Sequence, residues 1–559
     1  MTNKNKITKP KINNTGNFLQ NITFDEKVSY ISLIFLILLV FLIRSKFENI
    51  PFERDEGSYS YYGKLLLEGK IPYKDFYEQK FPGIFYFYAF MEFLFGYSVK
   101  ELHNGFMLLN IATLTVLFFA SKKIFNPYAA IITTATFAFT SLTPIISGFT
   151  IQSEHGVAFF TSLGILTYVY ARETKKWFYY LLMGLAMGCA FMTKTTGVFL
   201  ALWGGFILII DTLFDKQKSL KSFFKSFGLY SFGGFFVIGL LFFIIYAKGS
   251  FNEMLFWSIE IPKYYVNRMP LEEGLKYFEY TKNTIFQFNK FLWIHGLIGL
   301  IVILIVSKFS LNKKIMLISL GVASFFTIVP GYYFYGHYWL QLLPGLSILA
   351  GATCFGILNF VSEKFKINSK YLQFTYLGIF CVILYSHTSK FKQYYFKPNS
   401  EQILRSTYGN NPFPESMEVA KYLNKIMNPN DQIVAIGSEP QMYIYTNKKS
   451  PTRHIFFSAL VTNLPQHKEW QREYSKDIEY AKPKYIIYYN IPISLLVQQN
   501  TDKYIFDWAN KYVTENYNIV GIVDMIPGQR ANYVWREQLN GYKPQAQEQI
   551  FIYEKKNEK

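Results

Sequence analysis

Long apolar runs without a charged side chain constrain this chain more than any other feature. The stretch ISLIFLILLVFLI (31–43) is one such run, and 51% of the 559 residues are hydrophobic. A helix of roughly 20 apolar residues crosses the hydrocarbon core of a bilayer, and many windows of this sequence satisfy that condition. The sequence therefore predicts a polytopic α-helical membrane protein.

The apolar windows predict roughly eleven spanning helices, which together form a transmembrane domain over residues 28–388. The first apolar run follows a basic tail (1–27) but lacks a small-residue cleavage site, so we interpret it as a retained anchor. The predicted spans lie near 28–46, 101–121, 127–148, 153–171, 177–193, 196–213, 226–247, 288–307, 313–331, 338–360 and 371–388.

The formal net charge of +19 is concentrated largely in short loops. Basic clusters fall in every second loop, as the positive-inside rule expects of cytoplasmic loops. This distribution argues against nucleic acid as a partner. It predicts a cytoplasmic N-terminal tail, with the loop 47–100 and the tail from 389 on the outer side. The clusters are Lys4, Lys6, Lys9 and Lys11; Lys122 and Lys123; Arg172, Lys175 and Lys176; Lys216, Lys218, Lys221 and Lys225; Lys308, Lys313 and Lys314; and Lys364, Lys366 and Lys370.

The first outer loop is far longer than an ordinary connection between membrane helices. Its segment PFERDEGSYSYYGKLLLEGKIPYKDFYEQKFP (51–82) has acids at both ends and aromatic residues between them. Long loops without a folding reason are usually functional. Residues 56–68 predict an amphipathic helix in the interface plane, and 84–96 predict a second interfacial helix because they are too short to span. We expect chemistry on a lipid-borne substrate at the bilayer surface.

Adjacent acids in this loop, Asp55 and Glu56, are the catalytic candidates. A carboxylate can take the proton of an acceptor hydroxyl or amine, or hold a metal ion that neutralises a phosphate leaving group. Asp55 and Glu154 are the candidate ligands for such a divalent metal. The alternative for Asp55 and Glu56 is structural, because acids at a helix start satisfy free N–H groups and complement the macrodipole.

Further ionisable residues stand at predicted helix ends on the outer side. Lys80 precedes Pro82 and is placed to hold a lipid phosphate as a point charge, with Glu78 beside it; alternatively its side chain snorkels to headgroups. Glu154 and His155 open the fourth helix. They are candidate substrate contacts or capping residues.

Lys194 and His337 are the remaining candidates for binding phosphate. Lys194 lies between the fifth and sixth predicted helices, where it either binds phosphate or marks a helix end. His337 lies among tyrosines that also suit an interfacial belt. Arg268, in an outer loop, is a weaker candidate for substrate binding. Gly184 and Gly188 predict close helix packing through small residues.

After Tyr395 the composition becomes polar. Residues 389–414 predict a linker, and 415–559 predict an extracytoplasmic α/β domain in which helices and strands alternate. GSEPQ (437–441) lacks the glycine spacing of a phosphate loop, so we assign this domain no chemistry. The strands are predicted near 432–437, 485–490, 517–523 and 550–554.

On the motif RDEGSYSYYGKLLLEGKIPYKDFYEQKFPG, the chain resembles the GT-C-type membrane glycosyltransferases. It is most similar to the branch of protein O-mannosyltransferases and the aminoarabinose transferase of lipid A, glycosyltransferase family 39. QSEH, GLAMGCAFMTKTTG and GHYWLQLLPG add to the resemblance, which spans roughly residues 30–350.

The resemblance implies inverting transfer of a sugar from a polyprenyl-phosphate donor at the outer face of the bacterial inner membrane. Asp55 would act as the base with Glu56 beside it, and Lys80 would bind the donor phosphate, aided by Lys194 and His337. The chain reads EQKFPG where the family has two prolines after the lysine. The metal requirement varies in the family, and neither the sugar nor the acceptor (lipid, glycan or protein) follows from the resemblance.

Two other classes of function remain at this point. A transporter or lipid flippase would place ionisable residues or broken helices at the bilayer midplane, often in repeated halves. Here the charges gather at helix ends and in one loop, and no clear internal repeat is present. A non-catalytic scaffold whose outer domain binds a partner is the third reading.

Overall fold

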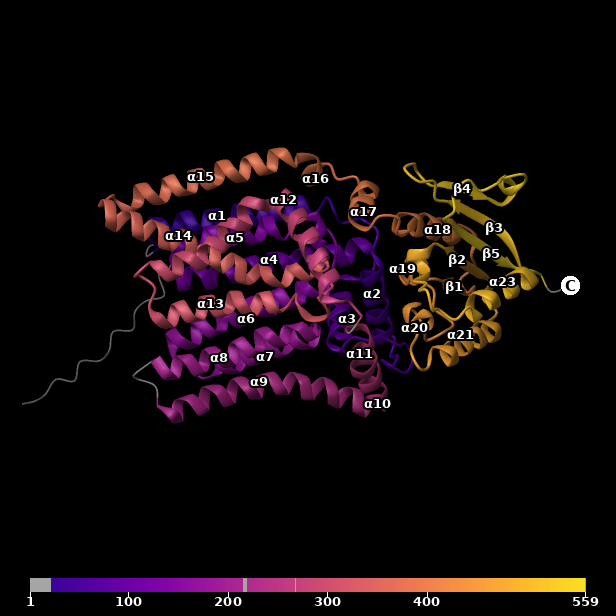
Figure 1. Cartoon of the computed structure of the whole chain (residues 1–559), viewed down its shortest axis with the longest axis horizontal. Coiled ribbons are helices and arrows are strands. Elements are labelled where there is room, and N and C mark those ends of the chain that lie inside the picture. Colours follow the sequence, from indigo (N-terminus) through magenta and orange to yellow (C-terminus); the bar gives the residue numbers. More distant parts are fainter. Residues whose placement is uncertain (1–21, 215–218, 267, 558–559) are drawn as a thin grey trace, which may run out of the picture.

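The computed structural model describes residues 22–214, 219–266 and 268–557. Most of the predicted N-terminal tail, with Lys4 to Lys11, and Lys216 and Lys218 lie outside these residues. The long helices run side by side, α2, α3, α10 and α11 gather at one end of them, and a β-sheet lies beyond that end (Figure 1). The fold is therefore mostly helical.

Each segment predicted to span contains a helix. Six stretches of the described residues are long and apolar enough to cross a membrane: Phe24–Arg44, Val99–Ile124, Thr195–Phe214, Leu220–Ala247, Leu271–Ile305 and Gly336–Phe365. The long helices are α1 (Phe24–Arg44), α4 (Val99–Ile124), α5 (Pro127–Thr140), α6 (Ser153–Thr174), α7 (Phe178–Thr193), α8 (Val198–Phe214), α9 (Leu220–Ala247), α12 (Leu271–Ile305), α13 (Leu311–Phe326), α14 (Leu343–Phe365) and α15 (Ser369–Lys390).

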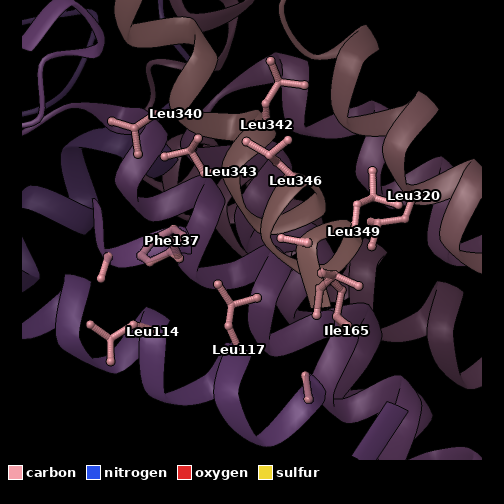
Figure 2. Packing of buried hydrophobic residues seen from close by; sticks show 14 of the residues in the cluster. Leu114, Leu117, Phe137, Ile165, Leu320, Leu340, Leu342, Leu343, Leu346 and Leu349 are labelled. Carbon is pink, nitrogen blue, oxygen red and sulfur yellow. The ribbon is translucent and has the colours of Figure 1, made fainter. Parts of the chain in front are cut away.

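Leucine, isoleucine and phenylalanine side chains of α4, α5, α6, α13 and α14 interlock in the centre of the helical part (Figure 2). Small residues allow α7 and α9 to pack closely. A Cβ atom at Gly184 would collide with the carbonyl oxygen of Tyr230, and one at Gly188 would lie 2.8 Å from that of Gly234. The close packing predicted from Gly184 and Gly188 is confirmed.

Short helices form the loops at the end of the bundle that carries α2. In the first loop these are α2 (Arg54–Leu67) and α3 (Gly83–Phe95), and in a later loop α10 (Phe251–Leu255), the π-helical turn η4 (Phe256–Glu260) and α11 (Ile261–Val266). The turns η2 (Pro144–Ile146), η3 (Thr195–Gly197), η5 (Pro330–Tyr332) and η6 (Gly336–Leu342) complete the set.

The sequence predicts α2 as an interfacial helix with one apolar face, whereas the structure buries the helix on more than one side. Residues Glu56 to Leu65 are all buried, because one side of the helix packs on α3 and the other on α19 (Gln441–Tyr445). Tyrosines at 59, 61 and 62 point to different sides of the helix. The helix therefore suits burial between two layers better than one apolar face in lipid.

The C-terminal α/β unit, residues 413–557, contains a five-stranded sheet in the order β1-β2-β5-β3-β4. Strands β1 and β2 are parallel and the other pairs antiparallel. The four predicted strands are present, whereas the short edge strand β4 was not predicted. The strands are β1 (Ile433–Ile436), β2 (Tyr485–Asn490), β3 (Tyr517–Asp524), β4 (Asn532–Trp535) and β5 (Gln549–Lys555). The helices are α18 (Phe413–Ile426), α19, α20 (Ser458–Val461), α21 (His467–Ala481), α22 (Pro492–Leu495) and α23 (Tyr504–Asn516), with the turn η7 (Arg536–Leu539).

The segment predicted as a linker, 389–414, is largely helical. It contains α16 (Lys392–Phe396) and α17 (Ser400–Tyr408). Ile403 and Leu404 are buried in the same apolar cluster as the membrane helices, and the Tyr408 hydroxyl lies 2.9 Å from that of Ser147. Although this segment is polar on average, one face of its helix is apolar and packs on the bundle. This packing attaches the C-terminal unit to the membrane helices.

Candidate active site

The first turn of α2 is organised by a reciprocal cap. The Glu53 side chain accepts a hydrogen bond from the backbone N–H of Glu56, and the Glu56 side chain accepts one from that of Glu53, both at 2.8 Å. These two bonds satisfy N–H groups that have no partner within the helix. The capping alternative thus describes Glu56, while Asp55 takes no part in the cap.

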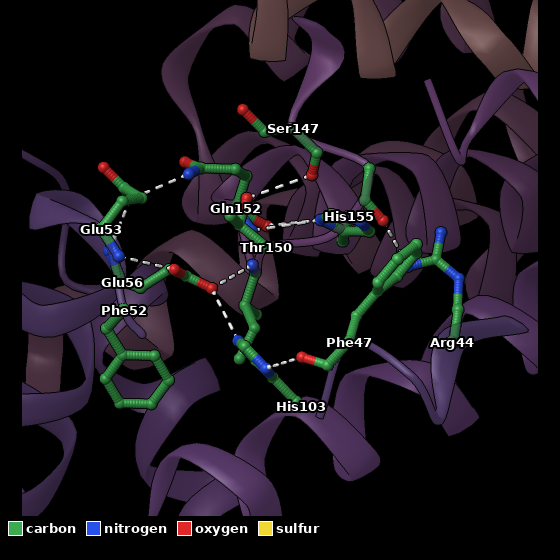
Figure 3. Close-up of polar contacts among 12 residues, drawn as sticks. Arg44, Phe47, Phe52, Glu53, Glu56, His103, Ser147, Thr150, Gln152 and His155 are labelled. Carbon is green, nitrogen blue, oxygen red and sulfur yellow. Dashed lines mark hydrogen bonds and ion pairs between the residues drawn. The ribbon is translucent and has the colours of Figure 1, made fainter. Parts of the chain in front are cut away.

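Glu56 also joins a buried polar network beneath α2 (Figure 3). Its Oε1 accepts a hydrogen bond from the backbone N–H of Ile151 and lies 3.1 Å from His103 Nε2. The other ring nitrogen of His103 lies 3.0 Å from the Phe47 carbonyl oxygen. Because Glu56 is fully buried and bonded through both oxygens, its position is structural rather than facing an open site.

We expect Glu56→Gln to destabilise the protein by about 1–3 kcal/mol, because both oxygens of Glu56 accept hydrogen bonds from N–H groups and an amide offers only one oxygen. One of these N–H groups would then face the side-chain NH2 of the glutamine, which is a donor and cannot accept its hydrogen bond. Thermal unfolding of the detergent-solubilised protein measures the loss. The control is Glu48→Gln, since the partners of Glu48 are the exposed Lys100 and the side-chain amides of Asn49 and Asn104, at 3.4 and 3.5 Å. Equal unfolding midpoints for the two variants would contradict the prediction.

His155 and Arg268, two predicted substrate contacts, lie apart from the other candidates. The Nδ1 atom of His155 accepts a hydrogen bond from the backbone N–H of Gln152, so the ring belongs to the buried network in Figure 3. Arg268 is exposed between α11 and α12. Neither side chain contributes to the charged cluster that the remaining candidates form.

Glu154, Lys194 and His337 form the centre of that cluster. Glu154, in the first turn of α6, is fully buried and makes an ion pair with Lys194, which follows the last residue of α7. The Nε2 atom of His337, in η6, lies 3.8 Å from Glu154 Oε1. The Lys194 ammonium lies 3.7 Å from the centre of the Tyr338 ring, where the π-face attracts a cation.

Glycines bring the segments of this cluster into contact. A Cβ at Gly83, the first residue of α3, would collide with the Met192 carbonyl oxygen near the end of α7. A Cβ at Gly156 would lie 2.9 Å from Thr193 Cγ2. These close approaches place the segment that carries Lys80 beside the segment that carries Lys194.

The Lys80 backbone is held by hydroxyl groups from two loops. The Tyr73 and Ser258 hydroxyls both donate to its carbonyl oxygen, at 2.6 and 3.0 Å. Its ammonium lies 3.7 Å from Glu78 Oε1, and the side chain is 41% exposed. Burial acts to lower the pKa of Lys80, but the carboxylates of Glu78 and Asp55 raise it above its ordinary value. Lys80 is therefore a persistent and accessible cation.

Asp55 faces this cluster from the second position of α2. Its charge acts on both Lys80 and Lys194, and its side chain is half-buried. Within the part of the chain that the structure describes, no side chain or N–H group hydrogen-bonds to its carboxylate. The structure thus brings together six of the predicted residues: Asp55, Glu78, Lys80, Glu154, Lys194 and His337.

The Glu53 carboxyl makes the stability of the folded protein depend on pH. Burial raises its pKa well above the ordinary value of 4.5, and the charges of Asp55 and Glu56 add to the effect. The folded protein therefore keeps a proton on Glu53 that the unfolded chain releases above about pH 4.5. This contribution to stability is full below that pH and is lost as the pH rises toward the folded-state pKa.

We expect the variant Glu53→Gln to keep its stability as the pH rises. The amide cannot ionise, and it keeps the carbonyl oxygen that accepts the hydrogen bond from Gln152 (2.9 Å). The unfolding midpoint of the variant should rise relative to wild type as the pH increases from 5 to 8. Glu68→Gln, at a surface ion pair with Lys449, serves as control. Parallel pH curves for wild type and Glu53→Gln would refute the argument.

The predicted metal ligands, Asp55 and Glu154, lie in a cluster that also holds positive side chains. Asp55 and Glu154 are two carboxylates among three potential cations, and Glu154 is already paired with Lys194. The described residues contain no group of three or more His, Cys, Asp and Glu side chains that could hold an ion. The cationic side chains beside these carboxylates repel a further positive ion, so this donor set does not favour a metal, and the mechanism proposed below uses none.

Comparison with known proteins identifies the class. The family model described as dolichyl-phosphate-mannose-protein mannosyltransferase matches residues 79–247, which include Lys80, Glu154 and Lys194. No curated protein matches the chain. The crystal structure of ArnT from Cupriavidus metallidurans bound to undecaprenyl phosphate is similar, with a TM-score of 0.57 at 14% identity over 94% of this chain and 97% of that one. The family match and the fold together indicate a GT-C-type glycosyltransferase.

A second solved structure shares the GT-C fold. The archaeal oligosaccharyltransferase AglB from Archaeoglobus fulgidus, in complex with an inhibitory peptide and a dolichol-phosphate, superposes with a TM-score of 0.51. The identity is 12%, and the match covers 92% of this chain and 75% of that one. The resemblance to GT-C-type glycosyltransferases noted from the sequence is thereby confirmed.

Proposed function

We propose that this GT-C-type glycosyltransferase transfers a sugar, with inversion, from a polyprenyl-phosphate donor to an acceptor at the outer face of a bacterial inner membrane. One observation carries the proposal. A carboxylate without a hydrogen-bond partner among the described residues, Asp55, lies with two cationic side chains and a histidine at one end of a bundle of membrane-type helices. A base beside a cluster of positive charge is what sugar transfer from a phosphate requires.

Asp55 acts as the base in this mechanism. As the acceptor oxygen or nitrogen bonds to the anomeric carbon, its proton passes to the Asp55 carboxylate. The bond between that carbon and the phosphate oxygen breaks on the opposite side, so the configuration at the sugar inverts. The electron pair of the broken bond leaves with the polyprenyl phosphate.

Lys80, Lys194 and His337 bind the donor phosphate and stabilise the charge that develops as it leaves. Lys80 is the accessible one of the two lysines, whereas Lys194 is anchored by Glu154. Groups fixed before the reaction stabilise developing charge without reorganising at the moment of transfer. Glu78, beside Lys80, orients that ammonium rather than contacting the phosphate.

An apolar groove fits the lipid part of the donor. It has a volume of about 500 Å³ between α8 and α13, and its lining includes Phe199, Trp203 and Val322. Helix α8 begins at Val198, four residues after Lys194. A phosphate at Lys194 would therefore have an apolar surface below it for an isoprenoid chain. ArnT and AglB share the fold. The structure of ArnT was solved bound to undecaprenyl phosphate, and that of AglB in complex with a dolichol-phosphate.

The charge distribution supports the placement of this site outside the cytoplasm. Described basic clusters stand at Lys122 and Lys123, which end α4, and between α14 and α15 at Lys366. The site instead lies where α2 and the C-terminal unit gather, at the other end of the bundle (Figure 1). With basic loops inside, all the predicted spans cross the membrane and the C-terminal α/β unit is extracytoplasmic.

Purified protein in lipid nanodiscs with labelled polyprenyl-phosphate sugars tests the proposal. We expect time-dependent release of free polyprenyl phosphate together with labelled acceptor when membrane extract supplies the acceptor. The alternative of a transporter or flippase predicts labelled lipid moved across vesicles without consumption. Movement without release of polyprenyl phosphate would refute glycosyl transfer, and mass spectrometry of surface glycans from a deletion strain would identify the acceptor.

A further inference from the structure

Arg54, the first residue of α2, is bound by the C-terminal α/β unit and the chain just before it. Its Nε donates to the Ser438 carbonyl oxygen at 2.6 Å. Its Nη2 donates to Glu439 Oε1 at 2.8 Å and to Asn411 Oδ1 at 3.0 Å. The guanidinium carbon lies 5.7 Å from the centre of the Phe413 ring. Contacts on several sides leave this side chain one orientation.

Glu439 is the charged partner in that arrangement, and its side chain is fully buried. Its second oxygen accepts a hydrogen bond from Gln441 Nε2 at 2.6 Å. A buried carboxylate needs its cation close by, since an unpaired charge in the interior is strongly unfavourable. The planar fork of Arg54 also matches its acceptors in a fixed direction, which a lysine could not do.

The backbones of the two parts are in contact at the same place. A Cβ atom at Gly57 would lie 2.6 Å from Gln441 Cβ, so no larger residue fits between α2 and α19. The backbone N–H of Phe52 donates to the Tyr445 hydroxyl at 2.6 Å. The first turn of α2 is therefore pressed against the segment that carries Glu439.

Asp55 is the residue of this turn that these contacts leave free. Glu53 and Glu56 are bonded on the membrane side by the network of Figure 3, and Arg54 is bonded on the side of the C-terminal unit. Because Glu53, Arg54 and Glu56 are all held, the backbone of this turn is fixed. The direction in which the Asp55 side chain leaves the helix is therefore fixed as well. A displacement of about 1 Å in a reacting group can cost 10²-fold in rate.

We propose that Glu439 is a positioning residue of the active site: through Arg54 it holds α2 so that the Asp55 carboxylate points at the acceptor. The inference rests on the proposed glycosyl transfer. The C-terminal unit, to which the sequence assigns no chemistry, then completes the site instead of serving as an appended module.

The variant Glu439→Gln in the full-length protein tests this, with transfer measured over a range of donor concentrations. We expect kcat to fall at least about 10-fold, because Asp55 is misplaced. The KM for the donor should stay within about 2-fold, because Lys80 and Lys194 keep their own contacts. Backbone amide exchange of residues 53–57 should become faster than in wild type.

Asp524→Asn is the matched control. Asp524 is also a fully buried carboxylate of the C-terminal unit, but it accepts hydrogen bonds from the Tyr542 hydroxyl and the Ala546 N–H, within β3 and its neighbours. This isosteric change perturbs the unit without touching α2. We expect unchanged kcat and unchanged amide exchange at 53–57.

Arg54→Lys keeps the test decisive if Glu439→Gln lowers the yield of folded protein. It retains a positive charge opposite Glu439 but loses the planar fork, so kcat should fall while the donor KM holds. Folded variants at residues 54 and 439 with kcat within about 2-fold of wild type, or no lower than that of Asp524→Asn, would overturn the inference. A wild type that releases no polyprenyl phosphate would overturn the proposed function itself.

Discussion

Replacing Asp55 by Asn is expected to lower the turnover of sugar transfer by roughly 10²- to 10⁴-fold, the usual contribution of a general base. The amide has nearly the shape of the carboxylate but cannot take a proton at neutral pH. Because Asp55 is half-buried and outside the cap of α2, the substitution should leave folding intact. Release of polyprenyl phosphate by the purified variant measures the effect.

Asp75→Asn is the control for Asp55→Asn. Asp75 is in the same loop and half-buried, and its Oδ2 accepts a hydrogen bond from the backbone N–H of Ile71 at 2.7 Å, so its role is local. We expect near wild-type turnover for this variant. Because a lysine is charged at neutral pH without help from Asp55, Asp55→Asn should lower turnover far more than it changes the donor KM. If turnover stays near wild type, Asp55 is not the base.

The helices were largely predictable, because long apolar windows in a membrane protein have few alternatives to a helix. The environment of α2 could not be predicted from the sequence. Its position depends on contact with Gln441 in α19, almost 400 residues later in the chain. No local sequence pattern predicts a contact over that separation. The same is true of Ile403 and Leu404, whose burial converts a polar-looking linker into packed helices.

The charged cluster could be anticipated only as separate residues. Lys80, Glu154, Lys194 and His337 each stand at the end of a predicted helix on the same side, which places them in one layer. The pairing of Glu154 with Lys194 depends on close glycine contacts that spacing does not reveal. Sequence reasoning also missed the Ser258 hydroxyl bound to the Lys80 carbonyl and the role of Arg54.

For Glu56 the competing readings from the sequence were catalysis and capping, and the structure favours capping. Both acids follow an N-cap position, and residue type alone does not separate them. The distinction comes from direction, since successive residues of a helix point about 100° apart. Glu56 points into the bundle toward His103, while the charge of Asp55 acts on Lys80 and Lys194.

The second large effect is expected for Lys80→Gln, which removes the accessible cation of the cluster. Loss of one group that stabilises developing negative charge typically costs 10²- to 10³-fold in turnover. Donor KM should rise as well, because Lys80 binds the phosphate before the reaction. Both parameters come from polyprenyl phosphate release at increasing donor concentration, and added salt should weaken wild-type binding more than that of the variant.

Folding should survive Lys80→Gln, because the loop is held through the Lys80 carbonyl by Tyr73 and Ser258 and the ammonium is 41% exposed. Lys74→Gln, at an exposed lysine of the same loop, controls for net charge. A donor KM and turnover equal to those of Lys74→Gln would remove Lys80 from the phosphate site. Lys194 would then have to bind the phosphate, and it could do so only by sharing its ammonium with Glu154.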